Sequence, residues 1–145
     1  MKYKKEVWGP HYWFVLHTIA HTYPKHPNQV IKKKYYEFIL NLPLLLPDIT
    51  ISNRFSHLLE KFPVTPYLDS RESFMKWMHF IHNRVNIING KPTMTYEDSL
   101  DAYFKHYDLD KSSKERKVND RKKKIKLGFI ISLLAGIGLY YYYDN

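Results

Sequence analysis

The stretch FMKWMHFIHNRVNII, residues Phe74 to Ile88, decides the fold that the sequence predicts. Its apolar side chains recur every three or four residues, which is the period of a helix with one buried face. Gly90 and Pro92 follow and end the pattern, with Gly90 as the expected left-handed cap. Asp69 and Glu72 precede it with the spacing of an N-terminal capping pair. We therefore expect a long amphipathic helix that buries Phe74, Trp77, Met78, Ile81, Val85 and Ile88.

The same spacing recurs on both sides of this helix. Residues 10–23, 31–42 and 48–62 each carry apolar side chains at helical intervals, and prolines separate these segments. Pro10 suits the first turn of the first of these helices. Thr95 and Asp98 are spaced to open a shorter helix that runs to residue 107. Since no alternating pattern typical of a strand occurs, the predicted class is all-α: a four-helix bundle plus a short fifth helix, with a C-terminal transmembrane helix.

The basic charge of the chain is concentrated beside an apolar segment. The formal net charge is +9, and residues 111–126 alone hold nine Lys or Arg against two acids. Because these charges are not spread over a folded face, nucleic acid is not an expected partner. Residues 127–143, LGFIISLLAGIGLYYYY, are uncharged, which is typical of a membrane anchor behind a polybasic flank. The alternative is a core helix packed on the bundle. The predicted domains are a helical domain over 1–107, a basic linker over 108–126 and a tail anchor over 127–143.

The chain contains no cysteine. It therefore cannot form a disulfide, a thiolate nucleophile, a zinc site with cysteine ligands or an iron–sulfur cluster from its own residues. Its hydrophobic content of 44% and aromatic content of 17% are typical of a globular domain.

Two predicted helices carry a second, more polar stripe. On the helix quoted above this stripe lies about a third of a turn from the apolar one and contains His79, His82, Asn83 and Asn86. On the first helix, Trp13 and His17 lie one turn apart, with Tyr23 beyond them. Taken alone, both stripes are typical of half-exposed polar faces or of core packing with a polar tip. A metal site is not expected, because no carboxylate or third histidine shares the spacing.

Three blocks of sequence occur in a recognisable order. They are WGPHYWFVLHTIAHTYP (Trp8 to Pro24), LPDITISNRF (Leu46 to Phe55) and, after Trp77, HNRVNIINGKP (His82 to Pro92). Together they resemble the Erv/ALR family of FAD-linked sulfhydryl oxidases, and most of all the small forms encoded by large DNA viruses. The resemblance covers residues 7–107. It implies a four-helix bundle that holds FAD between its helices, with a fifth helix at right angles.

The resemblance also implies which residues bind the cofactor. Indole and imidazole rings stack on planar groups, Asn amides bond to ring or ribose edges, and Lys meets the pyrophosphate, while the flavin itself carries the redox step. By their positions in the motifs, the implied cofactor-binding residues are Trp8, Gly9, Trp13, His17, Tyr23, His79, His82, Asn83, Asn86, Lys91 and Tyr103.

The cysteines of the family pattern are missing. The resemblance places Asp48 and Ile51 at the two positions of a Cys-x-x-Cys motif, and His79 and Tyr96 at a second cysteine pair that ties the fourth helix to the following segment. Asp cannot form a disulfide and Ile has no redox chemistry. No catalytic residue is therefore predicted. The expected function is that of a sulfhydryl oxidase family member that binds FAD and lacks its own dithiol relay.

Three hypotheses remain open on the sequence. The leading one is a membrane-anchored flavoprotein that acts with a thiol- or disulfide-bearing partner, with an active homologue or as a homodimer. The second is residual oxidase activity, in which a substrate thiol reaches the flavin through the gap at residues 48–51. The third is a flavin-free structural or interaction protein on the same helical frame. Under the positive-inside rule, the anchor would hold the helical domain on the cytosolic side of a host or virion membrane.

Overall fold

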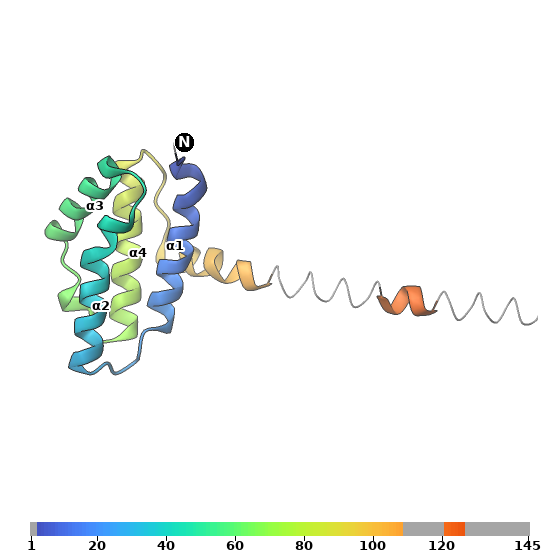
Figure 1. Ribbon diagram of the computed structural model, residues 1–145. Helices are drawn as coiled ribbons and strands as arrows, with labels where there is room; N and C mark the ends of the chain where they lie inside the picture. The colour runs from blue at the N-terminus through green and yellow to red at the C-terminus, as the bar shows by residue number, and fades with distance from the viewer. Residues whose placement is uncertain (1–2, 109–120, 127–145) are drawn as a thin grey trace, which may run out of the picture. The chain divides into compact units, whose positions relative to one another are not determined.

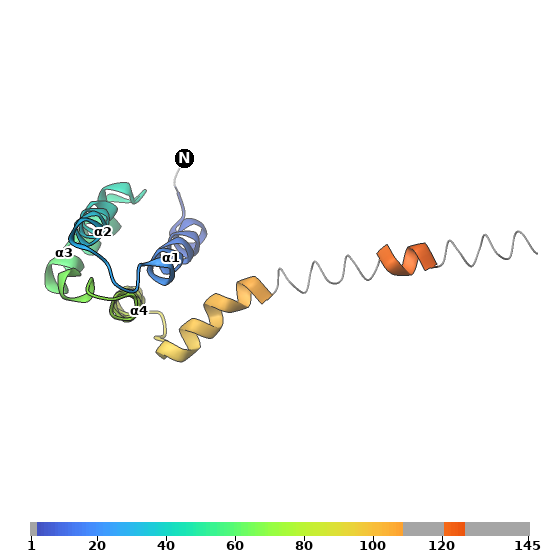
Figure 2. The same cartoon turned by 90° about the horizontal axis from the view of Figure 1, so that it is seen from below.

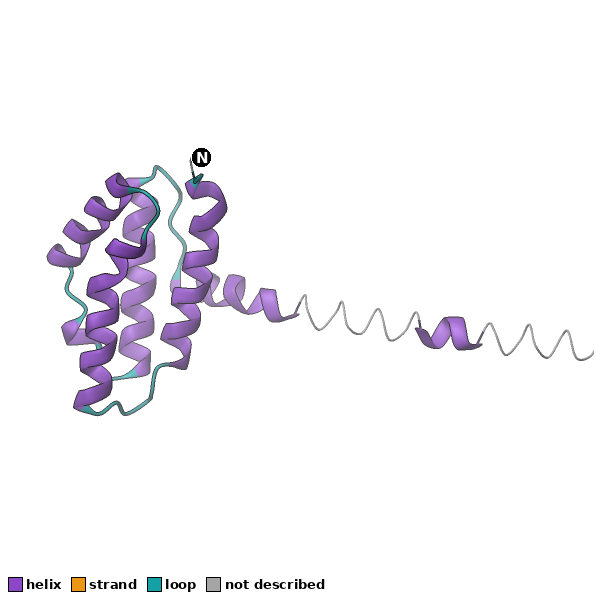
Figure 3. Cartoon of the chain, in the orientation of Figure 1, coloured by secondary structure: helices purple, strands orange, loops and turns teal. Residues whose placement is uncertain are grey.

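The computed structural model describes residues 3–108 and 121–126, and every regular element within these ranges is helical (Figure 3). The all-α prediction is therefore confirmed for this part of the chain. Two short 3₁₀ turns, η1 (Leu42–Leu45) and η2 (Thr65–Tyr67), lie between helices, and residues 96–108 form the fifth helix. The four long helices are α1 (Lys5–Thr22), α2 (Gln29–Asn41), α3 (Ile49–Lys61) and α4 (Arg71–Ile88).

The chain divides into two units, and the boundary falls inside the fifth helix. The first unit runs from Met1 to Tyr103 and holds the bundle, and the second begins at Phe104. Within the second unit, residues 104–108 and 121–126 are helical. No helix among the described residues combines the length and the apolar character needed to cross a membrane. The predicted anchor, residues 127–143, lies outside the described residues.

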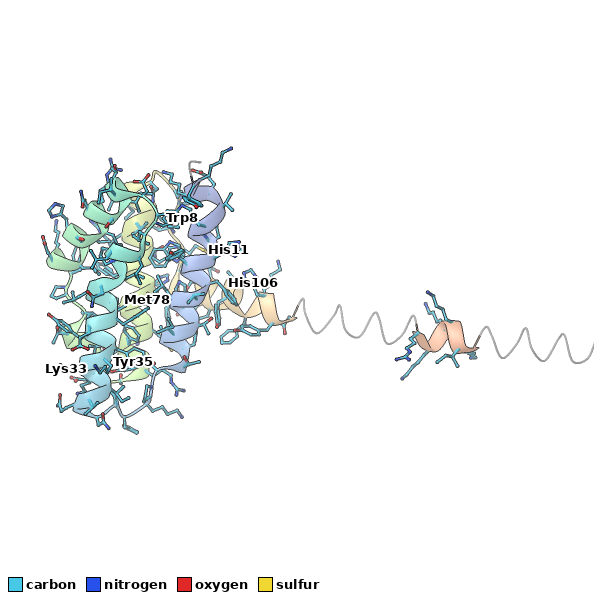
Figure 4. All side chains as sticks on the ribbon, in the orientation of Figure 1. Trp8, His11, Lys33, Tyr35, Met78 and His106 are labelled. Atoms are coloured by element: carbon cyan, nitrogen blue, oxygen red, sulfur yellow. The ribbon has the colours of Figure 1, made fainter. Side chains whose placement is uncertain are left out.

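Helix α4 supplies much of the core. Helix α1 packs along one side of it, and α2 and α3 lie on the other side (Figures 1 and 2). Phe74 and Ile81 are fully buried, and Met78, labelled in Figure 4, is 2% exposed. The predicted apolar stripe is confirmed along most of the helix, but Ile88 in its last turn is 48% exposed. The core therefore ends one turn before the helix does.

Asp48 fixes the beginning of α3. Its carboxylate accepts the backbone N–H groups of Thr50 and Ile51 at 2.9 and 3.1 Å. An acidic N-cap also interacts favourably with the helix dipole. The prediction that the third helix starts near Asp48 is confirmed, and this residue has a structural role independent of any redox chemistry.

Helix α4 is capped one residue later than predicted. The hydroxyl of Ser70 accepts the backbone N–H of Ser73 at 3.1 Å. The predicted capping pair of Asp69 and Glu72 is therefore wrong. Asp69 instead forms an ion pair with Lys32 of α2 at 2.6 Å. Ser70 has the extended backbone that an N-cap requires, so its short side chain reaches the first turn.

Helix α1 begins earlier than predicted. It starts at Lys5, so Pro10 lies in its interior and not in its first turn. Proline has no N–H, so the carbonyl of Glu6 loses its usual partner within the helix. The N–H of Trp8 donates to the carbonyl of Lys4 at 3.3 Å and holds the turn before the proline. As a result, Trp8 and Gly9 lie on regular helix.

The end of α4 agrees with the sequence. Gly90 has a φ of 66°, a conformation that glycine adopts without steric cost. Its N–H donates to the carbonyl of Ile87 at 3.0 Å, and the N–H of Lys91 donates to that of Asn86 at 2.8 Å. This pair of bonds is a Schellman cap, so the prediction for Gly90 is confirmed.

Candidate functional site

The facing sides of α1 and α4 bring together three of the predicted site residues. Trp13 of α1 stacks on His82 of α4, with ring centroids 3.9 Å apart and an interplanar angle of 7°. The Nε2 atom of His17, one turn further along α1, lies 3.0 Å from the Nδ1 atom of His82. One of these two nitrogens must carry the hydrogen of this bond. The two stripes that the sequence singled out on separate helices thus meet in one cluster.

Both histidines of this cluster are neutral at pH 7. The pKa of His17 is lowered to about 4, mainly by burial, with smaller contributions from the neighbouring His21 and His79. Burial likewise lowers the pKa of His82 to about 3, with smaller contributions from His17, His79 and Lys91. A neutral imidazole offers one donor and one acceptor. The cluster therefore presents flat, uncharged rings with hydrogen-bonding edges.

Tyr103 of the fifth helix closes one side of this cluster. It is 8% exposed, and its hydroxyl lies 2.9 Å from the Oγ1 atom of Thr18 on α1. Its ring stacks on His21 at 4.5 Å and on Phe14 at 5.5 Å, and its centroid lies 6.4 Å from that of His17. The sequence predicted Tyr103 but missed its three partners on α1. Their spacing of i, i+4 and i+7 marks one helix face and could have indicated them.

The first turns of α1 hold a buried donor without an acceptor. The indole Nε1 of Trp8 is buried and has no hydrogen-bond partner among the described residues. Figure 4 labels Trp8 near the start of α1, and its ring lies edge-on to Tyr12 at 5.3 Å. A methyl group added at the neighbouring Gly9 would meet no atom within 4 Å. Buried indole N–H groups usually find a partner, so Trp8 offers an unused donor.

The last two turns of α4 carry two further predicted residues. Asn86 is half-buried, and its side-chain carboxamide makes no hydrogen bond to the described residues. Its backbone carbonyl accepts the Lys91 N–H in the Schellman cap. The side chain of Lys91 is exposed. Asn86 therefore keeps both ends of its amide available, and Lys91 places a cation near the same end of the helix.

Three other predicted residues have evident structural partners. Tyr23 is fully buried, and its hydroxyl donates to the carbonyl of Leu68 at 2.8 Å. Asn83 uses its carboxamide on the backbone of Met94. His79 packs edge-on against Tyr96 with ring centroids 5.5 Å apart. The roles of these residues toward a cofactor stay predictions, but each already contributes to the fold.

The family pattern aligns positions 79 and 96 with its second cysteine pair. In this chain the rings of His79 and Tyr96 at these positions are in contact. The first pair falls on one turn of α3, with Asp48 as N-cap and Ile51 half-buried within the first turn. Among residues 3–108 and 121–126, no group of three or more His, Cys, Asp or Glu side chains is arranged to hold a metal ion.

Comparison with known proteins identifies relatives that cover most of the helical bundle. A model of the Erv1/Alr family matches residues 10–108. The chain is 36% identical over 101 residues to a probable FAD-linked sulfhydryl oxidase of Acanthamoeba polyphaga mimivirus, with 69% of this chain and 71% of the relative covered. It is 30% identical over 93 residues to a putative FAD-linked sulfhydryl oxidase of Invertebrate iridescent virus 6, with 61% of this chain and 84% of the relative covered.

Solved structures agree with the sequence relatives. The crystal structure of the yeast Erv1 core aligns with a TM-score of 0.62 and 25% sequence identity, covering 72% of this chain and 83% of that one. The FAD binding domain of Erv1 from Saccharomyces cerevisiae aligns equally well, covering 71% of this chain and 92% of the other. The family model covers most of the bundle, including the residues of both polar stripes. This chain therefore belongs to the Erv1/Alr family.

Proposed function

We propose that this chain binds FAD beside the Trp13–His17–His82 cluster and does not itself oxidise dithiols. The observation that carries the proposal is the meeting of these three side chains from α1 and α4 in a chain without cysteine. The ring centroids of Trp13 and His82 lie 3.9 Å apart, and Nε2 of His17 lies 3.0 Å from Nδ1 of His82. The relatives named as FAD-linked sulfhydryl oxidases support the cofactor. When bound, FAD supplies two-electron chemistry between thiols and oxygen.

The hydrogen-bonding, aromatic and charged groups of the site fit FAD. The buried N–H of Trp8 has no acceptor among the described residues, and a flavin nucleotide has many acceptors. Trp13 and His82 offer flat faces for stacking a planar ring. The carboxamide of Asn86 makes no hydrogen bond to the part of the chain that the structure describes, so it can donate and accept, and the ammonium of Lys91 suits a phosphate. These five residues would hold the cofactor, and Tyr103 would shield it from water.

The missing dithiol limits the chemistry of the chain. The carboxylate of Asp48 already accepts two N–H groups of α3, and Ile51 has an aliphatic side chain. Neither can exchange with a disulfide or accept electrons from a thiol. Thiols must therefore come from another molecule, either a protein partner with thiols or disulfides or an active homologue.

A flavin-free interaction protein is the second candidate. The observation in its favour is that the side chains of the cluster already contact one another: His82 stacks on Trp13 and bonds to His17. A planar cofactor would have to stack on the other face of one of these rings or replace one of these contacts. The flavin absorbance of the purified protein distinguishes the two candidates directly.

The cofactor prediction is tested with the purified full chain. We expect about one FAD per chain, since the side chains that carry the proposal form one cluster. Changing His82→Ala together with Asn86→Ala should release most of it, because stacking and the amide bonds are lost together. The matched control is Asn53→Ala with His57→Ala, an exposed Asn and His on α3. A colourless protein that gains no flavin band with added FAD would contradict the proposal.

Membrane attachment is proposed from residues 127–143 and the basic segment before them. Lys and Arg remain on the cytosolic side of a span, so the helical domain would face the cytosol. Deleting residues 127–145 should move the protein from the membrane fraction to the soluble fraction. Full-length chain that is extracted from membranes by carbonate would show that the segment does not span.

A further inference from the structure

Asn83 of α4 binds the chain that leaves the helix. Its Oδ1 accepts the N–H of Met94 at 3.1 Å, and its Nδ2 donates to the carbonyl of the same residue at 2.8 Å. The carboxamide of Asn83 thus bonds to both the N–H and the carbonyl of Met94. Nδ2 also lies 3.1 Å from Nε2 of His79 on the preceding turn. This contact requires His79 Nε2 to be the acceptor, so the imidazole is neutral with its hydrogen on Nδ1.

The same neighbourhood fixes the start of the fifth helix. His79 packs edge-on against Tyr96, the first residue of that helix, with centroids 5.5 Å apart. Thr95 caps it: its Oγ1 accepts the N–H of Asp98 at 3.1 Å and donates to the carboxylate of Asp98 at 2.8 Å. The prediction that Thr95 and Asp98 open the helix is confirmed. In Figure 1 the connection after α4 turns back along the bundle before this helix begins. Residues 94–96 are thus held to the middle of α4.

Two turns after Tyr96, Tyr103 reaches α1. It bonds to Thr18 at 2.9 Å and stacks on His21 at 4.5 Å. The segment between Met94 and Tyr103 is therefore attached at both ends, first to α4 and then to α1. A short helix attached at two points has its rotation and its register fixed. The contact at α4 and the ring of Tyr103 beside His17 are thus linked through one short helix.

We infer that Asn83 is a positioning residue. With His79 and Tyr96 it forms a clasp that fixes the fifth helix. Tyr103 is then held over the face of α1 that carries His17, beside the proposed cofactor site. This inference rests on the proposed function, because it assigns the clasp to the FAD site. The clasp is made of an amide, an imidazole and a phenol ring. Its strength is therefore independent of the thiol redox state of its surroundings. Asn83 acts through the fifth helix and needs no contact with the cofactor.

The first test changes Asn83→Ala in the full chain. Two measurements are made: amide hydrogen exchange of residues 96–103 without cofactor, and FAD affinity. Three hydrogen bonds are lost, so protection of these amides should fall roughly tenfold or more. The apparent dissociation constant for FAD should rise by about the same factor, since the arrangement in which the fifth helix is attached to α4 becomes less populated. Asn53→Ala, at an exposed Asn of α3, is the matched control and should change neither quantity.

The second test restores the attachment covalently. In the Asn83→Ala background, His79→Cys and Tyr96→Cys place thiols at the two positions that the family pattern aligns with a cysteine pair. Oxidation with diamide to the disulfide should recover amide protection and FAD affinity, and reduction should abolish both again. The reduced and oxidised forms have the same sequence, so only the link differs. Recovery would show that Asn83 acts by holding the helix and not by touching the cofactor.

Three outcomes overturn the inference. Unchanged protection of residues 96–103 in Asn83→Ala would show that the amide does not hold the helix. Lost protection with unchanged FAD affinity would show that the clasp does not serve the cofactor site. A confirmed 79–96 disulfide that restores protection without restoring affinity would indicate that Asn83 contacts the cofactor itself. If the unmodified chain takes up no FAD, the proposed function fails, and the role of the clasp in holding the helix is judged on hydrogen exchange alone.

Discussion

Acidification from pH 7 to pH 4 is expected to lower the free energy of unfolding by several kcal/mol through His17 and His82. In the folded state their pKa values are about 4 and about 3, because both rings are buried and lie beside other basic groups. In the unfolded chain each returns to the ordinary value of 6.5. Each unit of difference corresponds to about 1.4 kcal/mol. The two rings together therefore form the largest acid-sensitive element that we identify in the bundle.

The sign of the effect follows from proton binding. Below pH 6.5 the unfolded chain takes up protons at His17 and His82 that the folded chain does not bind, so unfolding becomes more favourable as the pH falls. Well above pH 6.5 both states are neutral and this contribution is constant. The loss thus occurs between about pH 6.5 and the folded pKa values. Burial also lowers the pKa of His21 and of His79, which adds to the loss in the same direction.

Urea unfolding at a series of pH values tests this prediction. The double change His17→Gln and His82→Gln removes both groups, so the decrease in stability between pH 6.5 and pH 4 should become much shallower. His57→Gln, at an exposed position on α3, is the control and should keep the steep decrease of the unmodified chain. If the double variant loses stability as steeply as the unmodified chain, the pair is not the source of acid sensitivity.

Periodicity predicted the helices because it reports on burial, which is a local property of the sequence. Phe74, Trp77 and Ile81 follow the helical period and are all buried. Helix ends were less predictable, because several residues in a row can act as caps. Ser70 has the extended backbone of an N-cap, and the neighbouring Asp69 is drawn to Lys32 of another helix. Position alone could not decide between two adjacent capping side chains.

The spacing of residues in the sequence could not predict contacts between distant segments. Spacing placed His82 and Asn83 on one stripe, but it could not show that His82 bonds to His17 while Asn83 binds Met94. Two adjacent residues on one stripe therefore have different roles. Tyr23 shows the same limit, since its hydroxyl is used by the carbonyl of Leu68 in the core. Only the folded chain distinguishes a residue that faces the site from one that supports it.

The double change Asp48→Cys and Ile51→Cys is expected to create dithiol oxidase activity. Both positions lie on the first turn of α3, where spacing i and i+3 brings side chains together. A helix N-terminus also lowers the pKa of a thiol and favours the reactive thiolate. The unmodified chain should oxidise dithiothreitol no faster than free FAD. The variant should exceed it by on the order of a hundredfold, since a thiol donor held beside the bound flavin replaces a chance collision.

Two controls separate the thiols from changes in the helix. Asp48→Ser with Ile51→Ala keeps a capping hydroxyl and has no thiol, so it should remain inactive. Asn53→Cys with Ser56→Cys places the same spacing further along α3, away from the N-terminus, and should gain little. Oxygen consumption gives the rate, and a mass loss of two hydrogens confirms the 48–51 disulfide. Turnover by the unmodified chain well above the rate of free FAD would contradict the proposal that it lacks oxidase activity. A flavin-loaded double variant that forms the disulfide but stays inert would mean that the first turn of α3 no longer faces the cofactor, so the geometry of the site has changed along with its cysteines.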